Sequence, residues 1–271
     1  MVYDTYYVYD EFGRKKYEIP PAATQVFKEG SAFHFTHTDA VFEELIYENI
    51  YDARGRLKSK KSPGIGLTHY VYDQLDRVIL SQNPKQRSTQ LTINEWSFTK
   101  YDESGRVIMT GIYKSNDDAV TLQQTADNTA AYFEKRTDNI AINYGYTNVS
   151  FPILGASDEV LTVTYFDFYE SSWPAFQPSP YGSQFIERVT GLKTAEMIRT
   201  LNASTQQELL SVYYYDKDYN VIQDQSQNHL SGWDIFNREF DWTGKLLRSQ
   251  REHTSGFITA PLSIYKRYEY D

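Results

Sequence analysis

Cysteine is absent from the 271 residues, which excludes a disulfide framework, a cysteine-ligated zinc or iron–sulfur centre and a thiol nucleophile. No apolar run approaches the roughly 18 residues of a membrane-spanning helix. Residues 1–10 also lack the cationic and then apolar layout of a signal peptide, so no membrane insertion is expected. Basic residues number 27 against 36 acidic ones. Because the phosphate backbone rewards clustered Lys and Arg, this acidic balance argues against a nucleic-acid partner.

Aromatic residues, in contrast, are abundant. The chain holds 24 Tyr, 15 Phe and 4 Trp, together 16% of its residues. Tyrosine favours half-buried pleated surfaces, where its ring packs and its hydroxyl stays in contact with water. A chain of this length can also bury enough surface to fold without a metal or covalent staple. The composition therefore predicts a mostly β fold.

One short phrase, aromatic-Asp-x-x-Gly-basic, recurs along the whole chain, and internal repetition of this kind indicates a repeat architecture. Complete copies lie at residues 7–14, 51–57 and 101–107, looser copies at 70–78, 213–221 and 240–246, and front halves at 165–167 and 268–271. The sequence is expected to be a single array segment over residues 1–271, with an insertion-rich middle at about 115–210. Because it finishes on the opening of a repeat, we expect a segment excised from a longer array.

Each copy predicts the corner of a β-hairpin. Two aromatic residues share one face of a strand, the aspartate accepts backbone N–H groups in the turn, and the glycine adopts the left-handed conformation of a type I turn followed by a bulge. Asp76 and Asn220 stand in for this glycine, since both residue types tolerate that region. The basic residue begins the return strand and is expected to lie across the preceding ring, a contact of about 0.5–1 kcal/mol.

The segments between the corners are less regular. Alternation predicts strands, and amphipathic spacing predicts helix, with Asn116 or Asp117 as the cap of the longer helix. The predicted segments are strands at 92–98 and 160–165, a helix at Val120–Arg136, a helical turn at Ser204–Leu210, and a proline-rich loop at Trp173–Gly182. The fold class is therefore mainly β: an antiparallel hairpin repeat array with one or two short helical insertions. An unpartnered edge strand at 268–270 is expected to favour self-association.

The phrase Tyr-x-Tyr-Asp-x-x-Gly-Arg at residues 7–14 resembles the tyrosine–aspartate (YD) repeat of rearrangement-hotspot (Rhs) proteins, bacterial wall-associated proteins and teneurins. Other stretches, at 98–113, 161–167, 190–194 and 227–230, look like large exported repeat proteins of the Bacteroidetes. The resemblance implies a spiral β-sheet winding into a hollow shell, which in relatives encloses a C-terminal toxin or serves in surface recognition. It further implies an exported or cell-surface location, with the remainder of the parent repeat chain as partner. The terminal core region with self-cleavage is missing, so neither toxin nor protease activity carries over.

Motifs for metal, cofactor or catalytic chemistry are missing. His34 and His37 are close, but their odd spacing in an expected strand sends the two rings to opposite faces. A calcium-like stretch begins at Asp216, yet Val221 and Gln227 replace the required glycine and bidentate glutamate. No hydrolase, metalloprotease or phosphate-loop motif occurs. We therefore predict no catalytic residue, cofactor or metal.

Two hypotheses remain from this sequence. The leading one is a non-catalytic structural scaffold segment of a larger YD-repeat protein. The alternative is a carbohydrate-binding surface module, since exposed aromatic rings bind sugars by stacking. Among Trp96, Trp173, Trp233 and Trp242, the residue in the proline-rich loop, Trp173, is the expected exposed one. A glycan-active enzyme would in addition need two facing carboxyl groups across a substrate.

Overall fold

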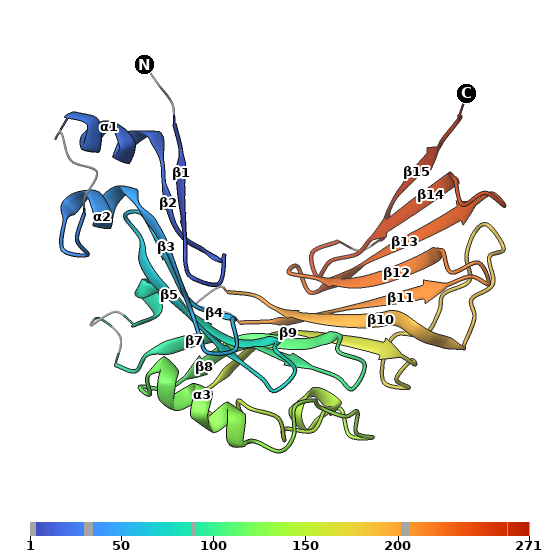
Figure 1. Ribbon diagram of the computed structural model, residues 1–271. Coiled ribbons are helices and arrows are strands. Elements are labelled where there is room, and N and C mark those ends of the chain that lie inside the picture. The colour runs from blue at the N-terminus through green and yellow to red at the C-terminus, as the bar shows by residue number, and fades with distance from the viewer. Residues whose placement is uncertain are drawn as a thin grey trace. The chain divides into compact units, whose positions relative to one another are not determined.

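The computed structural model describes residues 4–29, 35–87, 90, 92–201, 206–258 and 260–270. Within these ranges fifteen strands form one open antiparallel sheet, in which strand order follows sequence order (Figure 1). The prediction of a mainly β, antiparallel hairpin array is therefore confirmed. The chain divides into two compact units, Met1–Arg106 with Gly111–Glu159, and Val107–Thr110 with Val160–Asp271. A single array segment over residues 1–271 stays a prediction.

The first unit is a run of hairpins with three helices among its described residues. Its strands are β1 (Tyr6–Tyr9), β2 (Lys15–Ile19), β3 (Tyr47–Tyr51), β4 (Leu57–Ser62), β5 (Gly66–Tyr72), β6 (Val78–Gln82) and β7 (Glu95–Tyr101), and β8 (Val107–Lys114) is shared between the units. Its helical elements are α1 (Pro21–Glu29), α2 (Ala40–Leu45), α3 (Ala119–Asn128), and the short 3₁₀ turns η1 (Pro84–Arg87) and η2 (Asn143–Gly145).

The second unit consists of longer hairpins. Its strands are β9 (Glu159–Asp167), β10 (Val189–Arg199), β11 (Glu208–Tyr215), β12 (Val221–Asn228), β13 (Gly232–Phe240), β14 (Leu246–His253) and β15 (Leu262–Arg267). The predicted strand at 160–165 lies inside β9, whereas the strand predicted at 92–98 begins later, at Glu95. Residues 173–182 form a loop, as predicted.

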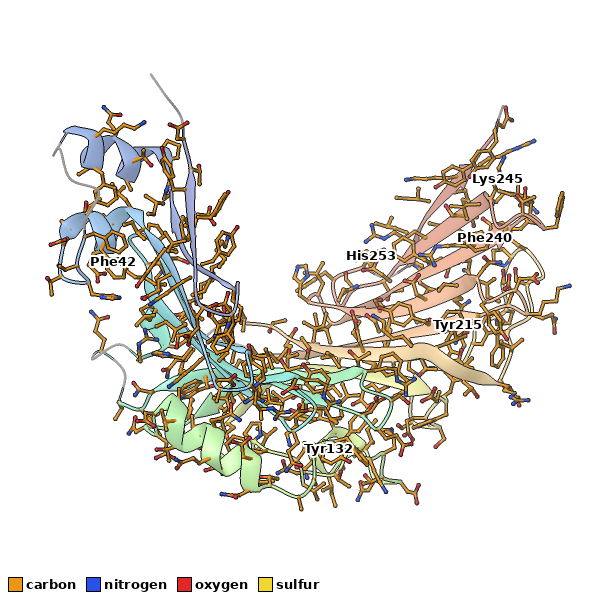
Figure 2. All side chains as sticks on the ribbon, in the orientation of Figure 1. Phe42, Tyr132, Tyr215, Phe240, Lys245 and His253 are labelled. Carbon is orange, nitrogen blue, oxygen red and sulfur yellow. The ribbon has the colours of Figure 1, made fainter. Side chains whose placement is uncertain are left out.

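Helices α1 and α2 were not predicted, and they cover an apolar cluster beside β2. The cluster is formed by Ile19, Ala23, Phe27, Phe42 and Ile46, all buried, and Phe42 is labelled beneath α2 in Figure 2. Buried Lys61 lies at the end of α2 and donates to the carbonyl oxygen of Glu43 at 2.9 Å. Its ammonium group thereby satisfies one of the carbonyls that a helix end leaves open.

Helix α3 is shorter than the predicted helix Val120–Arg136. Asp118, rather than Asn116 or Asp117, caps it by accepting the Thr121 N–H at 2.8 Å. The helix ends at Asn128 because the chain beyond it follows the sheet: the Glu134 N–H donates to the Tyr101 carbonyl at 2.8 Å. Tertiary contacts thus override the local helical pattern.

Two smaller expectations are wrong. In the predicted helical turn Ser204–Leu210, residues 208–210 belong to β11, while 204–205 lie outside the described residues. The strand predicted at 268–270 is also not a strand, since β15 ends at Arg267. Among the helices that the structure describes, none has the length and apolar character that crossing a bilayer requires.

Candidate functional site: the hairpin corners and the contacts between them

Each corner is organised by its aspartate. Asp10 accepts the N–H groups of Phe12 and Arg14 through Oδ1, both at 2.9 Å, and the Arg14 Nε through Oδ2 at 2.7 Å. The same three bonds recur at Asp52, Asp73 and Asp102, all between 2.7 and 2.9 Å. Hydrogen bonds to an ionised acceptor are shorter and stronger than those between neutral groups. The predicted turn function of the aspartate is confirmed.

A residue with positive φ closes each corner. Gly105 has φ 78°, and Asp76 adopts φ 61° at the equivalent place, as predicted. The prediction for Asn220 is wrong, because Tyr219 is the left-handed residue of that corner, with φ 66°. Asn220 instead occupies the place of the basic residue and donates from Nδ2 to Asp216 Oδ2 at 3.0 Å.

The basic residue of one corner lies over the tyrosine of the next corner. The Arg14 guanidinium carbon lies 4.5 Å from the centroid of the Tyr51 ring. The corresponding distances are 4.8 Å for Arg56 over Tyr72 and 4.2 Å for Arg77 over Tyr101. The sequence predicted contact with a preceding ring. Arg14 does lie 4.9 Å from the centroid of Phe12 in its own turn, but for Arg56 and Arg77 the contacted ring belongs to the next corner. Because Nε is bonded to the aspartate of its own corner, the guanidinium plane is directed toward the neighbouring hairpin.

The same tyrosine completes the connection through its hydroxyl group. Tyr51, Tyr72 and Tyr101 each donate at 2.9 Å to the carbonyl oxygen of the residue that follows the stacked arginine, which is Lys15, Leu57 and Val78 respectively. Burial raises the pKa of the Tyr72 and Tyr101 hydroxyls, which keeps them protonated as donors. We call this unit a rung: the aspartate and basic residue of one corner with the tyrosine of the next.

The second unit contains a corresponding contact. The Lys245 ammonium nitrogen lies 5.2 Å from the centroid of the Tyr270 ring, and the Tyr270 hydroxyl donates to the Leu246 carbonyl at 2.8 Å. Figure 2 shows Lys245 and Phe240 at the β13–β14 hairpin. The rung therefore recurs with lysine in place of arginine.

A buried ion pair anchors the insertion between β8 and β9. The Lys100 Nζ lies 2.6 Å from Glu134 Oε1, and the two side chains are 1% and 0% exposed. Glu134 also accepts the N–H and hydroxyl groups of Ser150 at 3.0 and 2.6 Å. Burial opposes ionisation of Glu134, but Lys100 and the hydroxyl donors outweigh it and hold the pKa of the carboxyl below its usual value. The hydrogen-bonding positions of both charged groups are occupied by other groups of the protein.

The expected exposure of Trp173 is wrong. Its side chain is 8% exposed, and its ring packs edge-on against Tyr165 with centroids 5.1 Å apart. The proline-rich loop lies against the sheet, because the Gln177 N–H donates to the Gln223 side chain at 2.9 Å and the Gln223 amide donates back to the Gln177 carbonyl at 3.0 Å. Trp242, at the tip of the β13–β14 corner, is instead 94% exposed.

The described residues also offer few arrangements that could bind a metal ion or a substrate. His34 lies outside the described residues, while His37 Nε2 lies 3.1 Å from Glu48 Oε1. No group of three or more His, Asp or Glu side chains in the described ranges could hold a metal ion. A cavity of about 160 Å³ lies between α3 and Tyr70, and an open hollow of about 340 Å³ lies beside Trp233. Each has a single acidic side chain in its lining, Asp52 and Glu208 respectively.

Comparison with known proteins gives only distant structural similarity. Neither a protein-family model nor a curated protein sequence matches the chain. The chain is similar to the pore structure of the Photorhabdus luminescens Tc holotoxin, with 12% identity and a TM-score of 0.29. It is also similar to the crystal structures of TcdB2–TccC3–Cdc42 and TcdB2–TccC3–TEV, each with 14% identity and TM-scores of 0.30 and 0.28. The similarity covers 98% of this chain but only 13–14% of those chains, and values this low identify no shared activity.

The corner aspartate Asp52 makes the stability of the protein depend on pH. Although burial opposes ionisation, the Arg56 guanidinium and backbone N–H groups hold the pKa of Asp52 below its usual 3.8. Because this pKa is lowered in the folded state, the carboxylate stabilises the fold above about pH 4, and this contribution is lost as the pH falls further. We predict that Asp52→Asn lowers the free energy of unfolding at pH 7 by about 1–2 kcal/mol, as measured by urea denaturation.

The difference between Asp52→Asn and the parent protein should narrow steadily as the pH falls below about 4 and through the lowered pKa of the folded state, because the aspartate then becomes protonated. Glu103→Gln, at an exposed corner position, serves as control and should stay within about 0.5 kcal/mol of the parent. A loss that stays the same from pH 7 down to the lowest pH at which the protein remains folded would show that the charge of Asp52 contributes nothing.

Proposed function

We propose that this chain is a non-catalytic structural segment of a larger exported or cell-surface YD-repeat protein of the Rhs type, contributing to a β-shell. The proposal rests on what the recurrent residues of the repeat contact. The aspartate, the basic residue and the tyrosine that define each repeat bind one another across successive hairpins. In three rungs of the first unit the carboxylate, the guanidinium and the tyrosine are engaged with one another in the same way.

The rungs add to the stabilisation that the buried apolar side chains provide. Tyr72 is 9% exposed and the Arg56 side chain 10%, so the cation–ring contact is largely shielded from water. Such contacts contribute about 0.5–1 kcal/mol when exposed and about 2 kcal/mol when desolvated. Since each rung joins two neighbouring hairpins, stability accumulates along the array as nearest-neighbour terms. This is the behaviour expected of a scaffold whose partner is the remainder of its own repeat chain.

A double-mutant cycle tests the scaffold function. Arg77→Met and Tyr101→Leu remove the two sides of one rung, and we expect a coupling energy of about 0.5–2 kcal/mol in the free energy of unfolding. Arg77→Met combined with Leu substitution of Tyr113, a ring that packs on Phe151 instead, should give a coupling near zero. A zero coupling in the first cycle would show that the motif residues act independently and would contradict the proposal.

Carbohydrate binding is the second candidate function. The residue that supports it is Trp242 and not Trp173. Trp242 is 94% exposed, and Tyr219 on the neighbouring corner is 64% exposed. The two corners lie side by side, because a Cβ added to Gly244 would stand 3.8 Å from Asn220 Oδ1. Exposed aromatic rings offer apolar faces on which sugar rings stack.

A glycan-array screen tests this second candidate. If the chain binds a glycan through the corner tips, Trp242→Ala should reduce the array signal at least tenfold, a loss that corresponds to about 1.4 kcal/mol of binding free energy. Phe257→Ala, another highly exposed aromatic position, should leave the signal unchanged. A blank array would exclude the carbohydrate-binding candidate and would leave the scaffold function as proposed.

A further inference from the structure

Strand β1 has one open edge. It pairs with β2 on one side, and it stands first in the order of strands that the structure describes, so no described strand covers its other side. All four residues of β1, Tyr6–Tyr9, are exposed, and none of them is charged. An exposed aromatic edge of this kind is a template for pairing with another strand.

Tyr9 occupies the rung position of its corner, directly before Asp10. In Tyr51, Tyr72 and Tyr101 the equivalent ring is covered by an arginine and the hydroxyl is bonded to a carbonyl. Among the described residues, no cation lies over Tyr9 and no group accepts its hydroxyl. Its side chain is 57% exposed, against 9% for Tyr72. At the inner corners, a neighbouring return strand covers the part of the tyrosine that is exposed in Tyr9.

We propose that the open edge of β1, with Tyr9, binds the return strand of a further YD-type hairpin. This inference rests on the proposed scaffold function. The partner is defined by its chemistry. It is an antiparallel strand that begins with an arginine or lysine, and this basic residue is bonded to the aspartate of an Asp-x-x-Gly turn. Its cation covers the Tyr9 ring, and the carbonyl of the next residue accepts the Tyr9 hydroxyl.

A second copy of this fold does not provide such a strand. The return strands β2, β4, β6, β8, β12 and β14 each lie between two neighbours in the described sheet, so none is available without opening a copy. The binding hairpin is therefore an additional YD hairpin that is not part of a second folded copy of this sheet.

The test adds one such hairpin to the full chain. A copy of residues 47–65, which comprises β3, its corner, β4 and the following turn, is joined directly to residue 3. In this fusion Tyr9 follows the added arginine at the same spacing at which Tyr72 follows Arg56. Amide hydrogen exchange of residues 6–9 is compared with and without the addition, and the β5–β6 amides report that the protein remains folded.

We expect the amides of residues 6–9 to exchange at least about tenfold more slowly in the fusion. Arg56→Gln in the added copy, and separately Tyr9→Leu, should each remove most of this protection. Unchanged exchange in the fusion, or protection that survives both substitutions, would overturn the inference. The Arg77–Tyr101 cycle in the same fusion separates the two claims: a retained coupling with unprotected β1 refutes only this inference, whereas a coupling of zero refutes the scaffold function.

Discussion

The bond between the corner aspartate and the arginine four residues later, present at Asp10, Asp52, Asp73 and Asp102, is the interaction on which the rest of the array depends. It closes the turn, because the carboxylate also holds two backbone N–H groups. It also fixes the direction of the guanidinium, since Nε is engaged and the plane can only face the neighbouring hairpin. A local contact thereby becomes a link between repeats. This explains how a chain with a net charge of −9 and no cysteine holds successive short hairpins together.

Polar groups are used in the same way in the interior. The Lys100–Glu134 pair holds the insertion after β8 against the sheet, and the Gln223 side chain bonds both backbone groups of Gln177. Burying such groups is tolerable only because every partner is supplied. Removing one partner of a buried pair leaves an uncompensated charge, so these residues specify where each loop docks. Matched polar contacts therefore specify the fold together with apolar burial.

The sequence predicted what depends on local chemistry. The corners, the sheet class and the loop containing Trp173 followed from residue types at fixed spacing. It did not predict what depends on neighbours: the direction of Arg14 and Arg56, the burial of Trp173, or the early end of α3. Pro21 at a first helical position was the available signal for α1. The left-handed Tyr219 had no signal, since aromatic residues rarely adopt that conformation.

The central claim is that each basic corner residue stabilises the following hairpin, and hydrogen exchange of Arg56→Met tests it most directly. Arg56 belongs to the β3–β4 hairpin, but its ring partner Tyr72 belongs to the β5–β6 hairpin. The account predicts faster amide exchange in both hairpins, with a clear loss of protection at the end of β5 next to Tyr72. A loss confined to β3–β4, with the β5–β6 hairpin unchanged, would contradict it.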